Sequence, residues 1–133
     1  FDSAGNDQYI ATMNMAQGAG HDFSIGWLMD SSGDDQYRAP NLSLGAGNAN
    51  GIGAFADLLG NDRYQSSGVT LGMAADAPAG TIRERGLCLG LFFDGAGTDQ
   101  YVGPTHAQQG KRSAQWTGRR TATESQVGVF FDR

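Results

Sequence analysis

The stretch Asp30-Ser31-Ser32-Gly33-Asp34-Asp35-Gln36-Tyr37 recurs along the chain and decides its fold. Its constant features are an Asp, a Gly three residues later, a second Asp and finally a Tyr. Other copies begin at Asp2, Asp57 and Asp94, and a partial fifth copy begins at Asp132. The first Asp residues are 28, 27, 37 and 38 positions apart. A repeat of this length predicts a repetitive architecture in which each copy is one structural unit.

The rest of each unit repeats as well. A Gly follows the Tyr by eight or nine residues, and another Gly precedes the next Asp by four, with three apolar residues between them. The last two units carry about ten extra residues between these two Gly positions. Because insertions in repeat proteins map to loops on one face, we expect two loops that lie side by side.

The predicted fold class is all-β. Frequent Gly residues leave no long stretch with helical periodicity, whereas short segments bounded by Gly, Asn and Asp are typical of strands. We expect residues 1–133 to form a single parallel β-solenoid (β-helix) domain of about four coils, each 27–38 residues long, within a longer repeat chain. An antiparallel β-sandwich also has short strands, but it does not account for the regular recurrence.

Side-chain alternation predicts which rows face the core. The position two before the first Asp is always bulky and apolar, and we expect it to point inward together with the four Tyr. The inward row is Leu28, Phe55, Phe92 and Phe130. Its neighbours then form an outward apolar row that either binds a partner or is covered within the chain. The members predicted to bind a partner are Trp27, Met29, Leu91, Phe93, Val129 and Phe131.

Stacking the units in register would place the Asp residues in two rows. Like charges about 5 Å apart repel by roughly 1 kcal/mol in water and by about 3 kcal/mol at an effective dielectric of 20. Either backbone N–H groups in Asx turns or a bound cation must therefore offset the repulsion. The candidate metal ligands are Asp2, Asp7, Asp30, Asp35, Asp57, Asp62, Asp94 and Asp99.

Gly97-Thr98-Asp99-Gln100-Tyr101 and its three counterparts resemble the core of RTX nonapeptide calcium-binding repeats. The resemblance implies Ca²⁺ as a cofactor, with Asp7, Asp35, Asp62 and Asp99 as ligands and the Tyr residues in the core. The chain departs from the family because it has one such motif per unit instead of a tandem array. Weak calcium sites of this kind need millimolar calcium, which favours an extracellular, cell-surface or periplasmic location.

The insertions are the expected place for specific recognition. Basic residues gather there, together with one Trp, and could bind an acidic glycan or an acidic protein surface. Alternatively, these basic residues could be solvent-exposed and only offset the negative charge of the rest of the chain. The residues proposed for partner binding are Arg83, Arg85, Arg112, Trp116, Arg119 and Arg120.

Composition excludes several functions. The net charge of −5 argues against nucleic acid as a partner, and no apolar run is long enough to span a membrane. The His21–Asp22 pair needs loop geometry to act as an acid–base pair, and Cys88 lacks a base nearby in sequence. Glu84 and Glu124 are the only Glu residues, so a glycosidase-type mechanism would depend on their separation.

Four functions remain open from the sequence. The leading hypothesis is a structural or interaction module that docks a protein partner or a neighbouring subunit. The alternatives are a carbohydrate-active β-helix enzyme of lyase, epimerase or hydrolase type, a module that binds acidic glycans, and a passive spacer.

Overall fold

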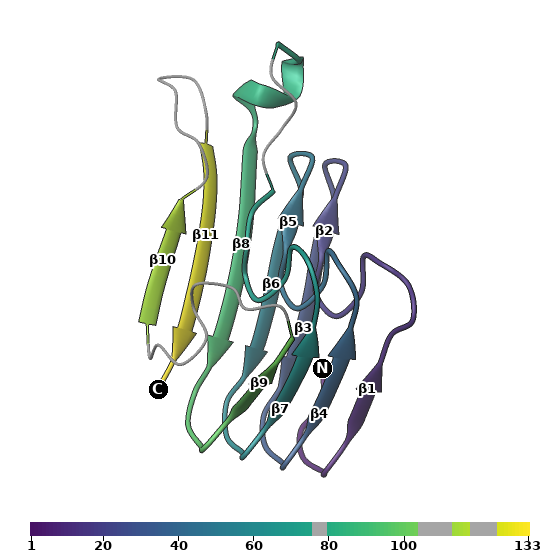
Figure 1. Cartoon of the computed structure of the whole chain (residues 1–133), viewed down its shortest axis with the longest axis vertical. Helices are drawn as coiled ribbons and strands as arrows, with labels where there is room; N and C mark the ends of the chain where they lie inside the picture. Colours follow the sequence, from purple (N-terminus) through teal and green to yellow (C-terminus); the bar gives the residue numbers. More distant parts are fainter. Residues whose placement is uncertain (76–79, 104–112, 118–124) are drawn as a thin grey trace.

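The structure, a computed structural model, describes residues 1–75, 80–103, 113–117 and 125–133 (Figure 1). The regular secondary structure of these residues is almost entirely β-strand, with one short 3-10 helix, η1 (Ile82–Arg85). No helix in the described ranges is long and apolar enough to cross a bilayer. The prediction of an all-β chain is confirmed.

The strands form three sheets, and each repeat adds one strand to each of the two larger ones. The four-stranded sheet has the order β1 (Gln8–Ile10), β4 (Gln36–Ala39), β7 (Arg63–Ser66) and β9 (Gln100–Val102). The five-stranded sheet has the order β10 (Ser113–Thr117), β11 (Ser125–Asp132), β8 (Leu87–Asp94), β6 (Ile52–Asp57) and β3 (Ile25–Asp30). The third sheet pairs β2 (Gly20–His21) with β5 (Gly47–Asn48).

Equivalent residues of successive units are direct partners across these sheets. Tyr9 pairs with Tyr37, which pairs with Tyr64, and the same parallel register continues to Tyr101. In the five-stranded sheet, the register joins Asp30, Asp57, Asp94 and Asp132. Figure 1 shows the strands of successive units running side by side in the same direction. The predicted rows of identical residues therefore exist.

Aromatic rings from the two larger sheets fill the space between them. The inward rows alternate as predicted, so that Tyr37 and Phe55 are both almost completely buried. Tyr37 stacks on Tyr64 with ring centroids 5.1 Å apart, and Phe55 stacks on Phe92 at 5.0 Å. The two columns meet edge to face, with Tyr37 and Phe55 centroids 4.9 Å apart. Such geometry adds attraction beyond the burial of apolar area.

The repeated Gly residues allow the backbones to approach closely. Gly45 has a φ of 75°, and a Cβ built on it would lie only 1.9 Å from the carbonyl oxygen of Leu91. No side chain can occupy that space. The loop that follows β4 is thereby held directly against the five-stranded sheet.

One part of the insertions differs from the expected loops. In the last unit, β10 pairs with β11 and is the only antiparallel partner among the described strands. Without β10, the outer edge of β11 would present unpaired backbone N–H and C=O groups, which an added strand satisfies. In the third unit, the insertion contributes η1, while residues 76–79 lie outside the described ranges.

We predict that Gly45→Ala lowers the free energy of unfolding by roughly 3 kcal/mol or more, because the added methyl overlaps the Leu91 carbonyl and the left-handed φ is unfavourable. Gly80→Ala is the matched control, since Gly80 has a similar φ of 76° but open space at its Cβ position. It should lose only about 1–2 kcal/mol. Urea unfolding of both variants measures the difference, and equal losses would contradict the close-packing argument.

Candidate metal centre and interaction surfaces

Both rows of Asp residues enter the interior at the turn that joins the two larger sheets. Asp30, Asp57 and Asp94 of the first row are fully buried, and Asp35 and Asp62 of the second row are 1% exposed. An ionised carboxylate in such a place requires hydrogen bonds or a counter-charge. The partners of each row therefore decide what the site can do.

The second Asp row accepts hydrogen bonds from the backbone of the preceding unit. The amide of Asp7 donates to Oδ1 of Asp35 at 2.6 Å, and the amide of Asp35 donates to Oδ1 of Asp62 at 2.7 Å. The amide of Asp62 continues the series to Oδ1 of Asp99 at 2.8 Å. These bonds join units, whereas the predicted local Asx turns occur in the first row, where the amide of Ser32 donates to Oδ1 of Asp30 at 3.2 Å. Each carboxylate thus fixes the register between its own unit and the preceding unit.

The first Asp row accepts hydrogen bonds from the Tyr hydroxyls, a partner that sequence reasoning missed. Tyr9 donates to Oδ2 of Asp30 at 2.5 Å, and Tyr37 donates to Oδ2 of Asp57 at 2.7 Å. Burial, followed by the bond to Asp57, raises the pKa of Tyr37 far above its usual range, so its hydroxyl remains a donor. The signal in the sequence was the use of Tyr instead of Phe in every copy.

The fourth unit breaks this regular pattern. Asp94 Oδ2 accepts from Tyr101 of its own unit at 3.0 Å. The buried hydroxyl of Tyr64 has no hydrogen-bond partner in the described part of the chain. The Tyr hydroxyls of the first two units thus join the first unit to the second and the second to the third.

Several carboxylate oxygens remain without a donor. Asp57 Oδ1, Asp62 Oδ2 and Asp94 Oδ1 are buried and have no hydrogen-bond partner among the described residues. Asp35, Asp57 and Asp62 offer oxygens that lie within 4.8 Å of one another, and so do Asp62, Asp94 and Asp99. A third, more exposed group consists of Asp2, Asp7 and Asp30. The unpartnered oxygens belong to the two buried clusters.

Burial raises the pKa of the clustered carboxyls. The pKa of Asp57 is raised to about 6, that of Asp94 to about 7 and that of Asp62 to about 8. Desolvation is the main cause in each, and neighbouring Asp charges raise the pKa further. The same cause raises the pKa of Asp35 and Asp99. The clusters therefore retain protons near neutral pH unless a cation replaces them.

The clusters offer ligand atoms of the type that a hard divalent cation takes. Two oxygens on opposite sides of a Ca²⁺ ion, each about 2.4 Å from it, are about 4.8 Å apart. Three equally spaced oxygens on such a sphere are about 4.2 Å apart, and each cluster offers three carboxylate oxygens that lie within 4.8 Å of one another. The unpartnered oxygens of Asp57, Asp62 and Asp94 are hard ligands of the type that calcium prefers. Proton and cation are thus alternative ways to neutralise the same oxygens.

The predicted outward apolar row is part of a larger surface, which we call the apolar face. It is the outer side of the five-stranded sheet, and its register aligns three rows across β3, β6, β8 and β11. Its most exposed members include Trp27 at 65% and Phe93 at 38%, while Phe93 stacks on Phe131 at 4.9 Å. Met29, Leu91, Val129 and Phe131 are half-buried. The rows are Ile25, Ile52, Leu89 and Val127; Trp27, Ala54, Leu91 and Val129; and Met29, Ala56, Phe93 and Phe131.

The structure describes only part of the predicted basic cluster. Arg83, on η1, forms an ion pair with Asp22 and lies over the ring of Phe23 at 5.6 Å. Arg112, Arg119 and Arg120 lie outside the described residues, and so do the side chains of Arg85 and Trp116. Whether these residues form one surface stays a prediction.

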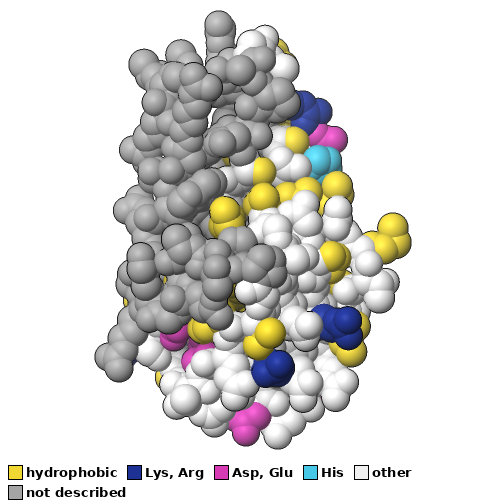
Figure 2. All heavy atoms as spheres, viewed as in Figure 1, with side chains coloured by type: hydrophobic (Ala, Val, Ile, Leu, Met, Phe, Trp, Pro, Cys, Tyr) yellow, Lys and Arg dark blue, Asp and Glu magenta, His cyan; other side chains and the backbone are white. Residues whose placement is uncertain are grey.

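His21 and Asp22 come together, contrary to the expectation for neighbours on one strand. Asp22 has a φ of 50° in the turn after β2, which brings its Oδ2 to 3.3 Å from Nε2 of His21. Asn48 lies 3.0 Å from the other ring nitrogen. Arg83 lowers the pKa of Asp22 through their hydrogen bond, so the carboxylate stays ionised and paired. Figure 2 shows basic, acidic and His side chains close together near one end.

The other candidates for chemistry gain no support. Cys88 is buried. The side chain of Glu84 and all of Glu124 lie outside the described residues, so their separation stays untested.

No protein-family model, no curated protein and no solved structure matches this chain.

We predict that, with a chelator present, the free energy of unfolding decreases as the pH rises from about 4 to about 8. The folded-state pKa values of Asp57, Asp62 and Asp94 exceed the unfolded value of about 3.9. The folded state therefore binds more protons in this window, and its stabilisation is complete below the window and lost above it. Urea unfolding across the pH range measures the slope.

Asp62→Asn is the control for this prediction. Its amide oxygen can still accept from Asp35, while its NH₂ group can donate to a neighbouring carboxylate without titrating. The variant should show a shallower slope than the wild type. A wild-type stability that is constant or rises between pH 4 and 8 would contradict the buried-proton account.

Proposed function

We propose that this chain is a β-solenoid interaction module that docks a protein partner through the apolar face, and that calcium bound by the Asp rows stiffens it. Parallel, in-register pairing of successive units supports the solenoid architecture. In such a fold, each unit buries its apolar side only against its neighbours. The fold then acts as a rigid support for the surfaces it carries.

The observation that carries the docking proposal is the apolar face. Its three rows span four strands without a charged side chain. Four strands of about six residues cover roughly 19 Å by 20 Å. A contiguous apolar surface of this size is comparable to the largest patches on monomeric proteins, which are commonly functional.

A second copy of the chain is the simplest partner for this face. Two flat apolar sheets can pack face to face at about 10 Å, as in β-sandwiches. The absence of charge from the described rows removes any local repulsion between two copies. The contact would be isologous, with the same residues contributed by both copies.

The calcium proposal rests on the unpartnered oxygens of Asp57, Asp62 and Asp94. A bound divalent cation would offset the repulsion between the buried carboxylates and supply the electrostatic partner they lack. Sites built from few carboxylates are filled at millimolar calcium, which supports a secreted, surface or periplasmic location.

The docking proposal predicts a concentration-dependent dimer in sedimentation velocity. The double variant Trp27→Glu, Phe93→Glu should be monomeric, because both side chains reach solvent from the apolar face and charges there must be desolvated on docking. Gln8→Glu, on the other outer sheet face, is the control and should dimerise like the wild type. A monomeric wild type, or a dimer that survives the double variant, would refute self-docking.

The calcium proposal predicts that millimolar Ca²⁺ raises the melting temperature, and that a chelator reverses the effect. At one hundred times the dissociation constant, the gain is about 2.7 kcal/mol. Asp62→Asn should lose most of it, because Asp62 belongs to both buried clusters. Asp34→Asn is the control, since Asp34 is exposed and lies outside the clusters. Equal calcium shifts in the two variants would rule out the buried clusters as the site.

A further inference from the structure

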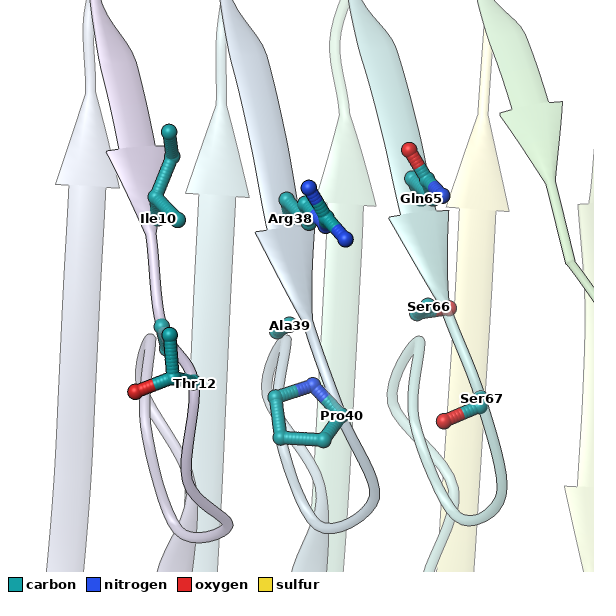
Figure 3. A pocket seen from close by; sticks show the side chains of 9 residues that line it. Ile10, Thr12, Arg38, Ala39, Pro40, Gln65, Ser66 and Ser67 are labelled. Atoms are coloured by element: carbon teal, nitrogen blue, oxygen red, sulfur yellow. The ribbon is translucent and has the colours of Figure 1, made fainter.

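The outer face of the four-stranded sheet carries a polar groove, which we call the arginine groove. A hollow of about 430 Å³ extends across the ends of β1, β4 and β7. Figure 3 shows Ile10, Arg38 and Gln65 in one row on the three neighbouring strands. A second row, on the segments that follow these strands, consists of Thr12, Pro40 and Ser67.

A smaller hollow of about 150 Å³ continues the groove along the strands. It shares Ile10, Arg38 and Gln65 with the larger one and adds Gln36 and Arg63. The register places Arg38 opposite Gln65 and Arg63 opposite Gln36. The two Arg are therefore diagonal neighbours, with backbones roughly 8 Å apart.

Neither arginine has an acidic partner in the described part of the chain, although the net charge is −5. Among the described residues, no carboxylate lies within ion-pair distance of either guanidinium. Arg63 donates to Oε1 of Gln100 at 2.8 Å, and the Arg38 guanidinium has no hydrogen-bond partner in the described part of the chain. Most N–H groups of the Arg38 and Arg63 guanidinium groups thus remain available to a ligand.

The groove chemistry matches a sugar acid. A guanidinium binds a carboxylate through two parallel hydrogen bonds. The amides of Gln36 and Gln65 and the hydroxyls of Thr12 and Ser67 can both donate to and accept from sugar hydroxyls. Ile10, which is 60% exposed, offers apolar contact to the C–H face of a ring.

Other ligand classes fit less well. Nucleic acid needs a denser basic surface than two arginines on an acidic chain. A peptide strand would be expected to use pockets for alternate side chains or an open sheet edge, whereas this groove crosses the middle of a paired sheet. A linear polymer that carries both carboxylates and hydroxyls satisfies the mixed amide, hydroxyl and guanidinium lining best.

We propose that the arginine groove binds an acidic oligosaccharide, with Arg38 and Arg63 each pairing with a uronate carboxylate. This inference concerns a different sheet from the apolar face and the basic insertions. It requires neither docking nor calcium binding. Failure of either proposal therefore leaves the other intact.

The repeat itself supplies substitutions that preserve the fold. Arg63→Gln introduces the residue found at the equivalent positions Gln8, Gln36 and Gln100. Arg38→Gln introduces the residue that its β7 partner, Gln65, already provides. Both side chains are exposed, so neither change disturbs the core. Arg133→Gln, on an exposed residue that follows β11 of the five-stranded sheet, controls for the loss of one positive charge.

The test is calorimetric titration of the whole chain with short uronate oligomers from pectate, alginate and glucuronan, beside neutral oligomers of the same length and a poly-glutamate peptide. We expect at least one uronate oligomer to bind and the neutral oligomers to bind at least tenfold more weakly. Arg38→Gln and Arg63→Gln should each weaken binding by about tenfold or more, and Arg133→Gln should not. Added salt should weaken wild-type binding.

Three results would overturn the proposal. They are the absence of binding by every uronate oligomer, binding that both groove variants leave unchanged, and tighter binding of poly-glutamate than of any sugar acid. Circular dichroism and thermal melting of the variants verify that lost binding does not reflect lost folding.

Discussion

The structure depends on the burial of one carboxyl row directly beside another. A carboxylate buried in a protein interior must be paired or hydrogen-bonded, and here a neighbouring unit supplies the hydrogen-bond donors. The backbone amide of Asp35 donates to Asp62, and the hydroxyl of Tyr37 donates to Asp57. A shift of one residue in the stacking would break both ladders and turn every inward ring outward. The polar turn thus specifies the register, while the aromatic columns supply most of the burial.

Stacking of identical residues has opposite consequences on different rows. Tyr and Phe rings gain from lying on their own kind, as the 5.0–5.2 Å spacings within the columns show. Carboxylates in the same arrangement repel one another and hold their protons to higher pH. The chain therefore contains a stabilising core and, in its third and fourth units, turns with unpartnered carboxylate oxygens. This contrast makes the turn the natural site for a proton or a cation.

The two outer sheet faces have different character although they share one scaffold. The apolar face combines Trp27, Leu91 and Phe93 with no charge among its described rows. The arginine groove is polar and carries Arg38 and Arg63. Because the faces belong to different sheets, the two proposed interactions would not compete for the same surface.

The sequence by itself determined the repeat, the all-β class, the parallel register and the inward and outward rows. These follow from local spacing and the two-residue alternation of strands, as Tyr37, Gln36 and Phe55 illustrate. Only the tertiary structure decided what the buried Asp residues contact. The hydroxyl that reaches Asp57 comes from 20 residues away, and the amide that reaches Asp62 from 27.

The same reason explains the remaining surprises. β10 pairs with the edge of β11 that would otherwise be open. The His21–Asp22 contact depends on the left-handed backbone conformation of Asp22. The arginine groove arises because the parallel register sets Arg38 beside Gln65 on a neighbouring strand. Local patterns determine which way a side chain points, whereas long-range packing determines what it meets.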